Sequence, residues 1–307
     1  MVRNYNSTLM GKCRDKDKAD RAITDLVIDF KTRVLLDKLV NSEKITSMKM
    51  CISSGKEANV YYAENWKTKE EFAIKIYRVE TMVFKDREDY IQGERRFRHG
   101  SVSSNPRKLI KLWAEKEFRN LRRIEQSGLK CPHAMELRDN LILMEFLGKD
   151  AKAYPRLIDC PMGPEEASQV YLDVVKIIRL MYFDCNLVHA DLSEYNLLYF
   201  EKQVYVIDVS QSVEESHPFS HEFLKRDIIN VNNYFRRMKV NVFPCKQVFR
   251  YATDNTIGKE MEELFLENLM EESMETAEDT EFEVTQFLNM EIPRTLQDMS
   301  PFEVEDV

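Results

Sequence analysis

The sequence predicts a mixed α+β fold in two lobes, a small β-rich lobe followed by a helical lobe. β-prone apolar runs gather in the first half of the chain, at residues 48–52, 60–64, 71–78 and 141–146. Apolar residues at helical spacing dominate the second half, over residues 164–184, 221–239 and 246–252. At 307 residues the chain is long enough to bury a substantial core, and we expect one two-lobed unit.

Two helices are expected around the strands of the first lobe. Residues 20–40 carry apolar side chains at helical spacing and are expected to pack on that lobe. Residues 107–127 show mixed three- and four-residue apolar spacing, and Pro106 suits the first turn of a helix. Near the end of the chain, residues 261–270 and 282–288 read as amphipathic pieces, and the polar residues 1–19 are expected to be disordered.

The most informative polar pattern is Leu-Val-His-Ala-Asp-Leu-Ser-Glu-Tyr-Asn at residues 187–196. It places Asp191 and Asn196 five residues apart, and Asp208 follows the next predicted strand. A phosphotransferase uses this spacing: Asp191 orients the attacking hydroxyl and accepts its proton, while Asn196 and Asp208 hold Mg²⁺ against the ATP phosphates. Oxygen ligands suit such a hard cation. His189 is interpreted as a packed, hydrogen-bonded histidine, because Asp191 already fills the role of base.

The predicted first lobe carries the partners that this chemistry needs. Lys75 lies inside the apolar run Phe-Ala-Ile-Lys-Ile-Tyr, and a half-buried lysine is unexpected unless an anion meets it. We expect it to bind the α- and β-phosphates of ATP and to be held by an acid on the following helix. Glu117 is the preferred acid and Glu115 the alternative; two residues apart, they face different sides of the helix.

Further nucleotide contacts are expected from the turn around Gly55 and from a hinge after residue 146. Backbone N–H groups at Gly55 can bind phosphate, with Ser54 and Lys56 adding side chains, although a single glycine is a weak signal. Backbone atoms of Glu145 and Leu147 are expected to meet adenine, with Met144 behind the ring. Four further apolar residues are candidates to enclose the base or to be ordinary core: Val60, Ala73, Leu198 and Ile207.

The chain resembles the RIO family of atypical protein kinases, and most closely its Rio-one branch. The matching segments include Cys51–Tyr61, Asn105–Lys108, Trp113–Glu117, Leu187–Asn196 and Ile207–Val213, and the similarity runs from about residue 20 to about residue 296. The resemblance implies a bilobal protein-kinase-like fold that lacks an activation loop and a peptide-docking segment. It places a kinase domain at residues 20–258, with its N-lobe ending near residue 146 and its C-lobe beginning at 147.

The resemblance also implies an activity and a setting. It implies an ATP- and Mg²⁺-dependent atypical serine/threonine protein kinase that phosphorylates itself and acts as an ATPase switch, with a transient phosphate allowed on Asp208. It further implies a cytoplasmic role in maturation of the small ribosomal subunit, with the RNA and proteins of the pre-40S particle as partners. Neither DNA nor a membrane is an expected partner.

Two other function classes remain open from the residues. Small-molecule kinases share the His-x-Asp-x-x-x-x-Asn loop, but they usually carry helical insertions for which this chain has little spare length. A non-catalytic module that keeps the nucleotide site as a scaffold is the second. Asp191, Asn196 and Asp208 are all intact, which argues against loss of activity.

Composition fits an intracellular enzyme with uneven charge. Six cysteines lie far apart without a C-x-x-C pair, and no apolar run approaches the roughly 18 residues of a membrane span. Residues 259–307 hold 16 acids and 2 bases, a net charge of −14, so residues 1–258 carry about +6 of the total −8. A basic body with an acidic extension is compatible with RNA binding or with simple solvation. The main basic cluster comprises Arg95, Arg96, Arg98, His99, Arg107, Lys108 and Lys111.

Overall fold

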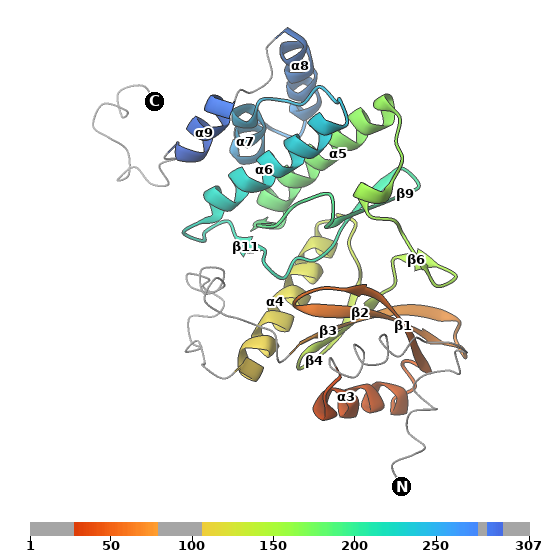
Figure 1. The fold of residues 1–307 in the computed structure, drawn as a ribbon. Helices are drawn as coiled ribbons and strands as arrows, with labels where there is room; N and C mark the ends of the chain where they lie inside the picture. The colour runs from red at the N-terminus through yellow and green to blue at the C-terminus, as the bar shows by residue number, and fades with distance from the viewer. Residues whose placement is uncertain (1–27, 79–105, 276–280, 291–307) are drawn as a thin grey trace.

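The computed structural model describes residues 28–78, 106–275 and 281–290. They form two lobes (Figure 1). The small lobe holds a five-stranded sheet with strand order β1-β2-β3-β5-β4, in which every neighbouring pair is antiparallel. Its strands are β1 (Ser47–Ser54), β2 (Ala58–Asn65), β3 (Glu70–Tyr77), β4 (Ala134–Arg138) and β5 (Leu141–Glu145).

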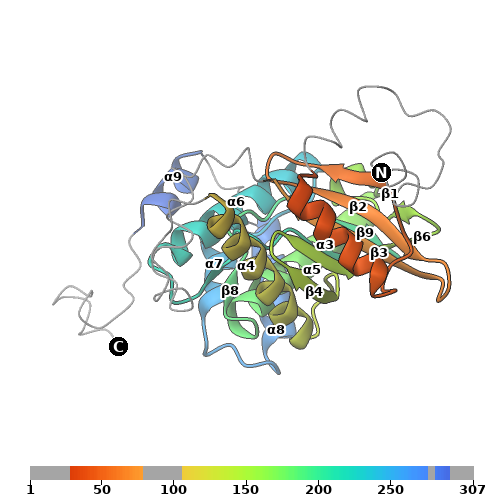
Figure 2. The same cartoon turned by 90° about the horizontal axis from the view of Figure 1, so that it is seen from below.

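Helices cover both faces of this sheet. Helix α3 (Phe30–Asn41) packs Leu36 and Leu39 against Ile74 and Ile76 of β3. The alternate residues of β3 belong to the opposite face, which packs on helix α4 (Pro106–Gln126), because successive side chains of a strand point to opposite sides. The central strand is therefore buried on both faces, and Lys75 lies within it. Figure 1 shows α3 at the outer end of the small lobe and α4 extending along the sheet toward the large lobe, and Figure 2 shows the two helices side by side.

The large lobe is mainly helical. Its core is formed by α5 (Pro164–Phe183), α6 (Ser220–Arg237) and α7 (Cys245–Thr253), which belong to one buried apolar cluster. Short strands and a 3₁₀ turn lie between the small lobe and these helices: β6 (Gly148–Lys149), β7 (Lys152–Ala153), η3 (Leu157–Asp159), β8 (Leu187–Val188), β9 (Leu197–Phe200), β10 (Gln203–Val206) and β11 (Val213–Glu214). The polar loop between β8 and β9 and the end of β10 face the small lobe (Figure 1).

Most expected elements are confirmed. The strands at 48–52, 60–64, 71–78 and 141–146 correspond to β1, β2, β3 and β5, and the helix at 107–127 corresponds to α4. Strand β4 was not expected, because its sequence Ala-Met-Glu-Leu-Arg has little apolar alternation. The expected disorder of residues 1–19, the first part of the 20–40 helix and the basic residues Arg95–His99 lie outside the described residues.

Residues beyond 258 contribute to the large lobe. The two amphipathic pieces form α8 (Glu262–Glu275) and α9 (Glu281–Asn289), and Leu266, Leu269 and Phe287 are buried in the main apolar cluster. The Lys225 ammonium of α6 donates to the Leu288 and Met290 carbonyls at the end of α9. The domain boundary at 258 stays a prediction. Within the described part of the chain, no helix is long and apolar enough to cross a membrane.

Arg179 of α5 joins the chain after α7 to the large lobe. Its buried guanidinium donates to the backbone carbonyls of Tyr251, Asp254 and Ile257, the last two at 3.1 and 2.5 Å. Its Nε also donates to Glu262 at 3.0 Å. Because these acceptors run from the last turn of α7, through the connecting turn, to the first residue of α8, this one side chain fixes how α8 leaves the helical core.

We expect Arg179→Met to lower the free energy of unfolding by about 3 kcal/mol, since it leaves several buried carbonyls without a donor. Chemical denaturation measures this change. Arg226→Met is the matched control, because Arg226 is exposed and its guanidinium lies over the Phe223 ring; it should shift stability by less than about 0.5 kcal/mol. Equal effects of the two substitutions would contradict the anchoring role.

Candidate active site

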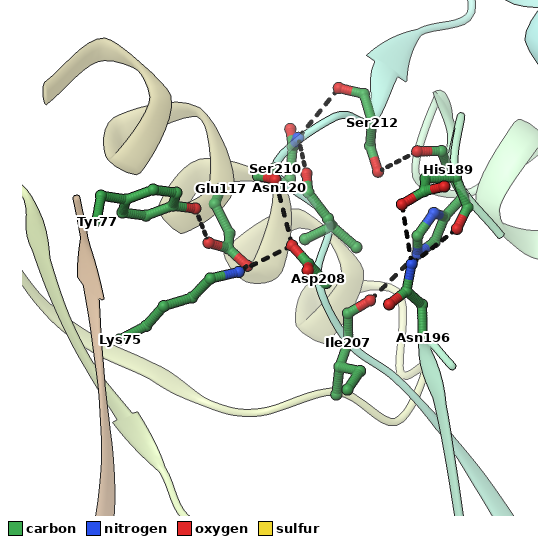
Figure 3. A network of polar contacts seen from close by, with 12 residues as sticks. Lys75, Tyr77, Glu117, Asn120, His189, Asn196, Ile207, Asp208, Ser210 and Ser212 are labelled. Atoms are coloured by element: carbon green, nitrogen blue, oxygen red, sulfur yellow. Dashed lines mark hydrogen bonds and ion pairs between the residues drawn. The ribbon is translucent and has the colours of Figure 1, made fainter. Parts of the chain in front are cut away.

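The site is built around the ammonium group of Lys75. Lys75 Nζ lies 2.7 Å from Glu117 Oε1 and 2.8 Å from Asp208 Oδ1 (Figure 3). The lysine comes from β3, the glutamate from α4 and the aspartate from the segment after β10. Only 6% of Lys75 and 2% of Glu117 are exposed, whereas 48% of the Asp208 side chain is. The ion pair is therefore buried on one side and open toward the cleft on the other.

The charges of this triad support one another. Burial alone lowers the pKa of Lys75, but the carboxylates of Asp208 and Glu117 outweigh it and raise that pKa above its ordinary value. Burial raises the pKa of Glu117, with Lys75 opposing the shift. At Asp208 the effect of burial is outweighed by Lys75, which lowers the pKa of this carboxyl. Lys75 stays protonated and Asp208 stays ionised near neutral pH, as phosphate and metal binding require.

Tyr77 is a third partner of Glu117. Its hydroxyl donates to Glu117 Oε2, while Lys75 contacts the other carboxylate oxygen. Tyr77 lies two residues after Lys75 on β3, so both side chains reach α4 from the same strand face. The backbone of the buried Tyr77 is also bonded to the β4–β5 turn: its N–H donates to the Asn140 carbonyl at 2.9 Å, and its carbonyl accepts from the Asn140 side-chain amide at 2.9 Å. Sequence reasoning missed this residue, although its spacing from Lys75 was a usable signal.

The loop after β8 presents Asp191 and Asn196. The Asn196 amide donates to the Asp191 backbone carbonyl at 2.8 Å and to its carboxylate at 3.1 Å, which leaves the amide oxygen of Asn196 as a potential metal ligand. Partial desolvation, followed by the negative charge of Asp208, raises the pKa of Asp191 to about 6, and the hydrogen bond from Asn196 opposes this shift. A carboxylate with that pKa is suited to accept a proton at neutral pH.

Asp227 of α6 fixes the backbone of this loop. Its two carboxylate oxygens accept from the N–H groups of Ala190 and Leu192, both at 2.8 Å. Ala190 has φ 67°, a left-handed conformation that a non-glycine residue rarely adopts without support. Asp191 lies between the two tethered residues, so α6 determines where its side chain projects. Asp227 was not singled out from the sequence, where it is one acid within a predicted amphipathic helix.

Asn120 fixes the segment that follows Asp208. Asn120 lies one turn after Glu117 on α4. Its side-chain amide donates to the backbone carbonyls of Val209 at 2.9 Å and Ser212 at 3.2 Å. The Ser210 hydroxyl donates to Asp208 Oδ1 at 3.2 Å, and Asp208 has φ 57°. Strand β11 and α6 follow directly, so the described chain has no long activation segment at this point. Helix α4 therefore positions both carboxylates that surround Lys75.

His189 lies behind the loop as expected for a packed histidine. His189 is only 2% exposed, and its Nε2 lies 3.2 Å from the Ile207 carbonyl. The Ser212 hydroxyl donates to the His189 backbone carbonyl at 3.0 Å (Figure 3). Burial lowers the pKa of His189 to about 4, so the ring is neutral at physiological pH. It links the loop to the segment after β10.

The turn around Gly55, expected from the sequence to bind phosphate, connects β1 and β2. The Gly55 N–H donates to the Ala58 carbonyl at 2.9 Å, and Lys56 is exposed. The Ser54 hydroxyl is directed to Asn59, at 3.1 Å, and Arg78 donates to both Ser54 and Asn59. Ser54 is thus part of the frame of the turn. Arg78, at the end of β3, is a support that sequence reasoning missed.

The hinge residues lie between the lobes. Met144 and Leu147 are 8% exposed and Leu198 is 9% exposed, Ala73 is buried, Val60 and Ile207 are half-buried, and Glu145 is exposed. The Leu147 carbonyl accepts from the Tyr154 N–H at 2.9 Å, while the Leu147 N–H makes no hydrogen bond within the described chain. That N–H is a donor available to a base edge, whereas the Leu147 carbonyl is already engaged.

The donors around the cleft fit a magnesium nucleotide. Asp208 offers a half-exposed carboxylate and Asn196 an amide oxygen, while Lys75 supplies a buried positive charge. Among the described residues, no group of three His, Cys, Asp or Glu is arranged to hold a metal. Mg²⁺ commonly binds one or two protein oxygens together with substrate phosphates and water, and the pair found here matches that pattern.

Comparison with known proteins identifies the family. The model of the RIO domain matches residues 59–248. The chain belongs to the RIO family, in its RIO1 branch. The serine/threonine-protein kinase rio1 of Dictyostelium discoideum is 46% identical over 283 residues, covering 91% of this chain and 49% of the relative. The serine/threonine-protein kinase RIO1 of Homo sapiens is 44% identical over 297 residues, covering 94% and 52%. This RIO1-branch chain thus spans about half the length of these relatives.

A solved structure supports the kinase-like fold. The Rio2 kinase–ADP/Mg²⁺–phosphoaspartate complex from Chaetomium thermophilum superposes with a TM-score of 0.54 at 21% identity, covering 79% of this chain and 75% of that one. At this identity the likeness concerns the fold alone. It confirms the bilobal α+β architecture predicted for this RIO1-branch chain, while the individual roles of the site residues stay predictions.

The geometry assigns Glu117, and not Glu115, to Lys75. Glu115 is paired with Arg119 at 2.5 Å on the outer face of α4. Glu117→Gln should lower kcat/KM for ATP by about tenfold, equivalent to about 1.4 kcal/mol, because Lys75 loses one of its two carboxylates. Tyr77→Phe should have a smaller effect, and Glu115→Gln, the matched control, should resemble the wild type. Steady-state ADP release measures all three, and a larger effect at Glu115 would contradict the assignment.

Proposed function

We propose that this chain is an ATP- and Mg²⁺-dependent atypical serine/threonine protein kinase that also hydrolyses ATP. The observation that supports this most directly is the triad of Lys75, Glu117 and Asp208 facing the loop of Asp191 and Asn196. The arrangement combines a phosphate-binding cation, a metal-binding acid and a base on opposite sides of one cleft. The names of the RIO1 relatives support the same activity.

Each residue then has a defined part in phosphoryl transfer. Lys75 binds and orients the nucleotide phosphates, and Glu117 with Tyr77 keeps its ammonium in place. Asn196 and Asp208 would hold Mg²⁺, which supplies charge neutralisation at the phosphates when bound. Asp191 accepts the proton of the attacking hydroxyl, or of water in the hydrolytic reaction. The Leu147 N–H is placed to meet the adenine edge, and Asp227 keeps Asp191 aimed into the cleft.

The wider role follows from the family resemblance. We place the protein in cytoplasmic maturation of the small ribosomal subunit, with pre-40S RNA and proteins as partners and with its own chain as a phosphoacceptor. ATP hydrolysis would then serve as a switch, and Asp208 is the residue that would carry a transient phosphate. Its half-exposed carboxylate is compatible with that chemistry.

The proposed chemistry is tested by separating binding from turnover. Asp191→Asn should retain nucleotide affinity and lose turnover by about 10²- to 10⁴-fold, because the carboxylate acts on the attacking oxygen and not on the nucleotide. Asp208→Ala should weaken Mg²⁺-dependent nucleotide binding as well. Calorimetry with ATP and Mg²⁺, alongside single-turnover ADP formation, distinguishes the two. Wild-type turnover by Asp191→Asn would exclude the proposed base.

The raised pKa of Asp191 predicts an acid limb in the activity. The carboxylate accepts a proton only when ionised, so kcat/KM should fall as the pH drops through about 6. Nucleotide affinity of Asp191→Asn over the same pH range corrects for protonation of ATP itself. A corrected midpoint near the ordinary aspartate value of 3.8 would show that the cleft does not perturb Asp191 as the structure indicates.

A further inference from the structure

A hollow of about 490 Å³ lies outside the cleft, between α3 and the start of α4. Figure 2 shows α3 and α4 side by side, and Asp139 and Asn140 of the β4–β5 turn also line the hollow. We refer to it below as the α3–α4 groove. Its volume is enough for a few side chains of a bound segment. The proposed catalytic roles use none of its lining residues.

The floor of the α3–α4 groove is apolar. Phe30 and Val34 are one turn apart on α3, and 81% and 37% of their surfaces are exposed. Leu35 is partly buried and Ile110 of α4 is fully buried, and together they continue the floor. Helix α3 already covers the sheet with Leu36 and Leu39, so Phe30 and Val34 form a second apolar stripe. Phe30 and Val34 are neighbours that line one hollow, and contiguous exposed apolar residues, unlike single scattered ones, mark interaction surfaces.

The rim of the α3–α4 groove is positively charged. Lys31 and Lys108 are exposed and have no ion-pair partner among the residues that the structure describes. Arg107 is paired with Asp29 at 2.6 Å and Lys111 with Asp139 at 2.9 Å. After these two pairs are counted, Lys31 and Lys108 remain without an ion-pair partner in the described part of the chain, at the edge of an apolar floor. That combination is complementary to carboxylates that flank an apolar side chain.

We propose that the α3–α4 groove docks a peptide segment of a partner protein in which a large apolar side chain is flanked by Asp or Glu. The apolar residue enters beside Phe30, Val34 and Leu35, and the flanking carboxylates meet Lys31 and Lys108. A nucleic acid fits less well, because single-stranded bases are bound on several flat aromatic faces and this floor has one aromatic side chain among aliphatic ones.

The groove is physically connected to the active site. Asn140 lines the groove, and its amide donates to the Tyr77 carbonyl at 2.9 Å and to Thr32 of α3 at 3.1 Å. Tyr77 in turn donates to Glu117, the partner of Lys75. A segment bound against α3 and α4 therefore acts on the residues that hold the lysine. This coupling rests on the proposed function, whereas docking itself does not.

The test is selection of peptides by the whole chain from a random displayed library. Enriched peptides should carry a large apolar residue flanked by acids. Measured by fluorescence anisotropy, binding of a labelled enriched peptide should weaken about tenfold or more in the Lys31→Glu, Lys108→Glu double variant and in Phe30→Ala, and it should weaken with added salt. The substituted side chains are exposed, so the fold should persist.

The matched control is the Lys202→Glu, Lys246→Glu double variant, which makes the same charge change at two exposed lysines of the large lobe and should leave peptide affinity unchanged. No acidic enrichment, or equal loss in the control, would overturn the proposal. The proposal would also be overturned if an RNA oligonucleotide bound the chain in a way that needs Lys31 and Lys108 but not Phe30. It would equally be overturned if the chain self-associated and the Lys31→Glu, Lys108→Glu double variant lost that self-association. Coupling between the groove and the active site is measured as a change in ATP affinity when the peptide is added. If the chain binds no ATP, the proposed function fails, whereas peptide docking is still tested by the anisotropy measurement.

Discussion

The position of one buried ammonium group governs how the two lobes of this protein meet. Lys75 lies in a strand covered on both faces, where an unpaired charge would be strongly disfavoured. Its carboxylate partners come from α4 and from the chain after β10, so the lysine joins three segments distant in sequence. The sheet and α4 must come together for Glu117 to compensate this charge, and the large lobe then adds Asp208 as a second carboxylate. The same requirement brings the phosphate-binding and metal-binding groups to one cleft.

A second layer of polar residues keeps these groups aimed. Tyr77 holds Glu117, Asn120 holds the backbone after Asp208, and Asp227 holds the backbone on either side of Asp191. Each donor or acceptor is buried and satisfies a group that would otherwise lack a partner, so stability and catalytic geometry depend on the same bonds. The left-handed backbone at Ala190 and Asp208 shows where this support is needed, since those conformations persist only when their surroundings fix them.

The sequence was sufficient wherever a role depends on local spacing. The loop from Asp191 to Asn196 and the strand around Lys75 are short continuous segments whose geometry follows from a loop and an alternating strand, and the structure brings them together. It was insufficient wherever a role depends on packing. Nothing local distinguishes Asp227 from the other acids of an amphipathic helix, and β4 has no apolar alternation to mark it. The burial of Leu266 and Phe287 was likewise hidden by the acidic residues around them.

Helix α4 connects the two surfaces for which roles are proposed. Its first turns carry Lys108 and Ile110 at the α3–α4 groove, and two turns further on it carries Glu117 and then Asn120 at the cleft. Ile110 and Glu117 are seven residues apart and so lie on one side of the helix. The helix is uninterrupted between them, so a displacement at its first turn moves the carboxylate that holds Lys75. The Asn140–Tyr77 bonds give a parallel connection through the sheet. The described chain between Asp208 and α6 is short, and α4 is the element that holds Lys75 through Glu117, holds the backbone after Asp208 through Asn120 and lines the α3–α4 groove.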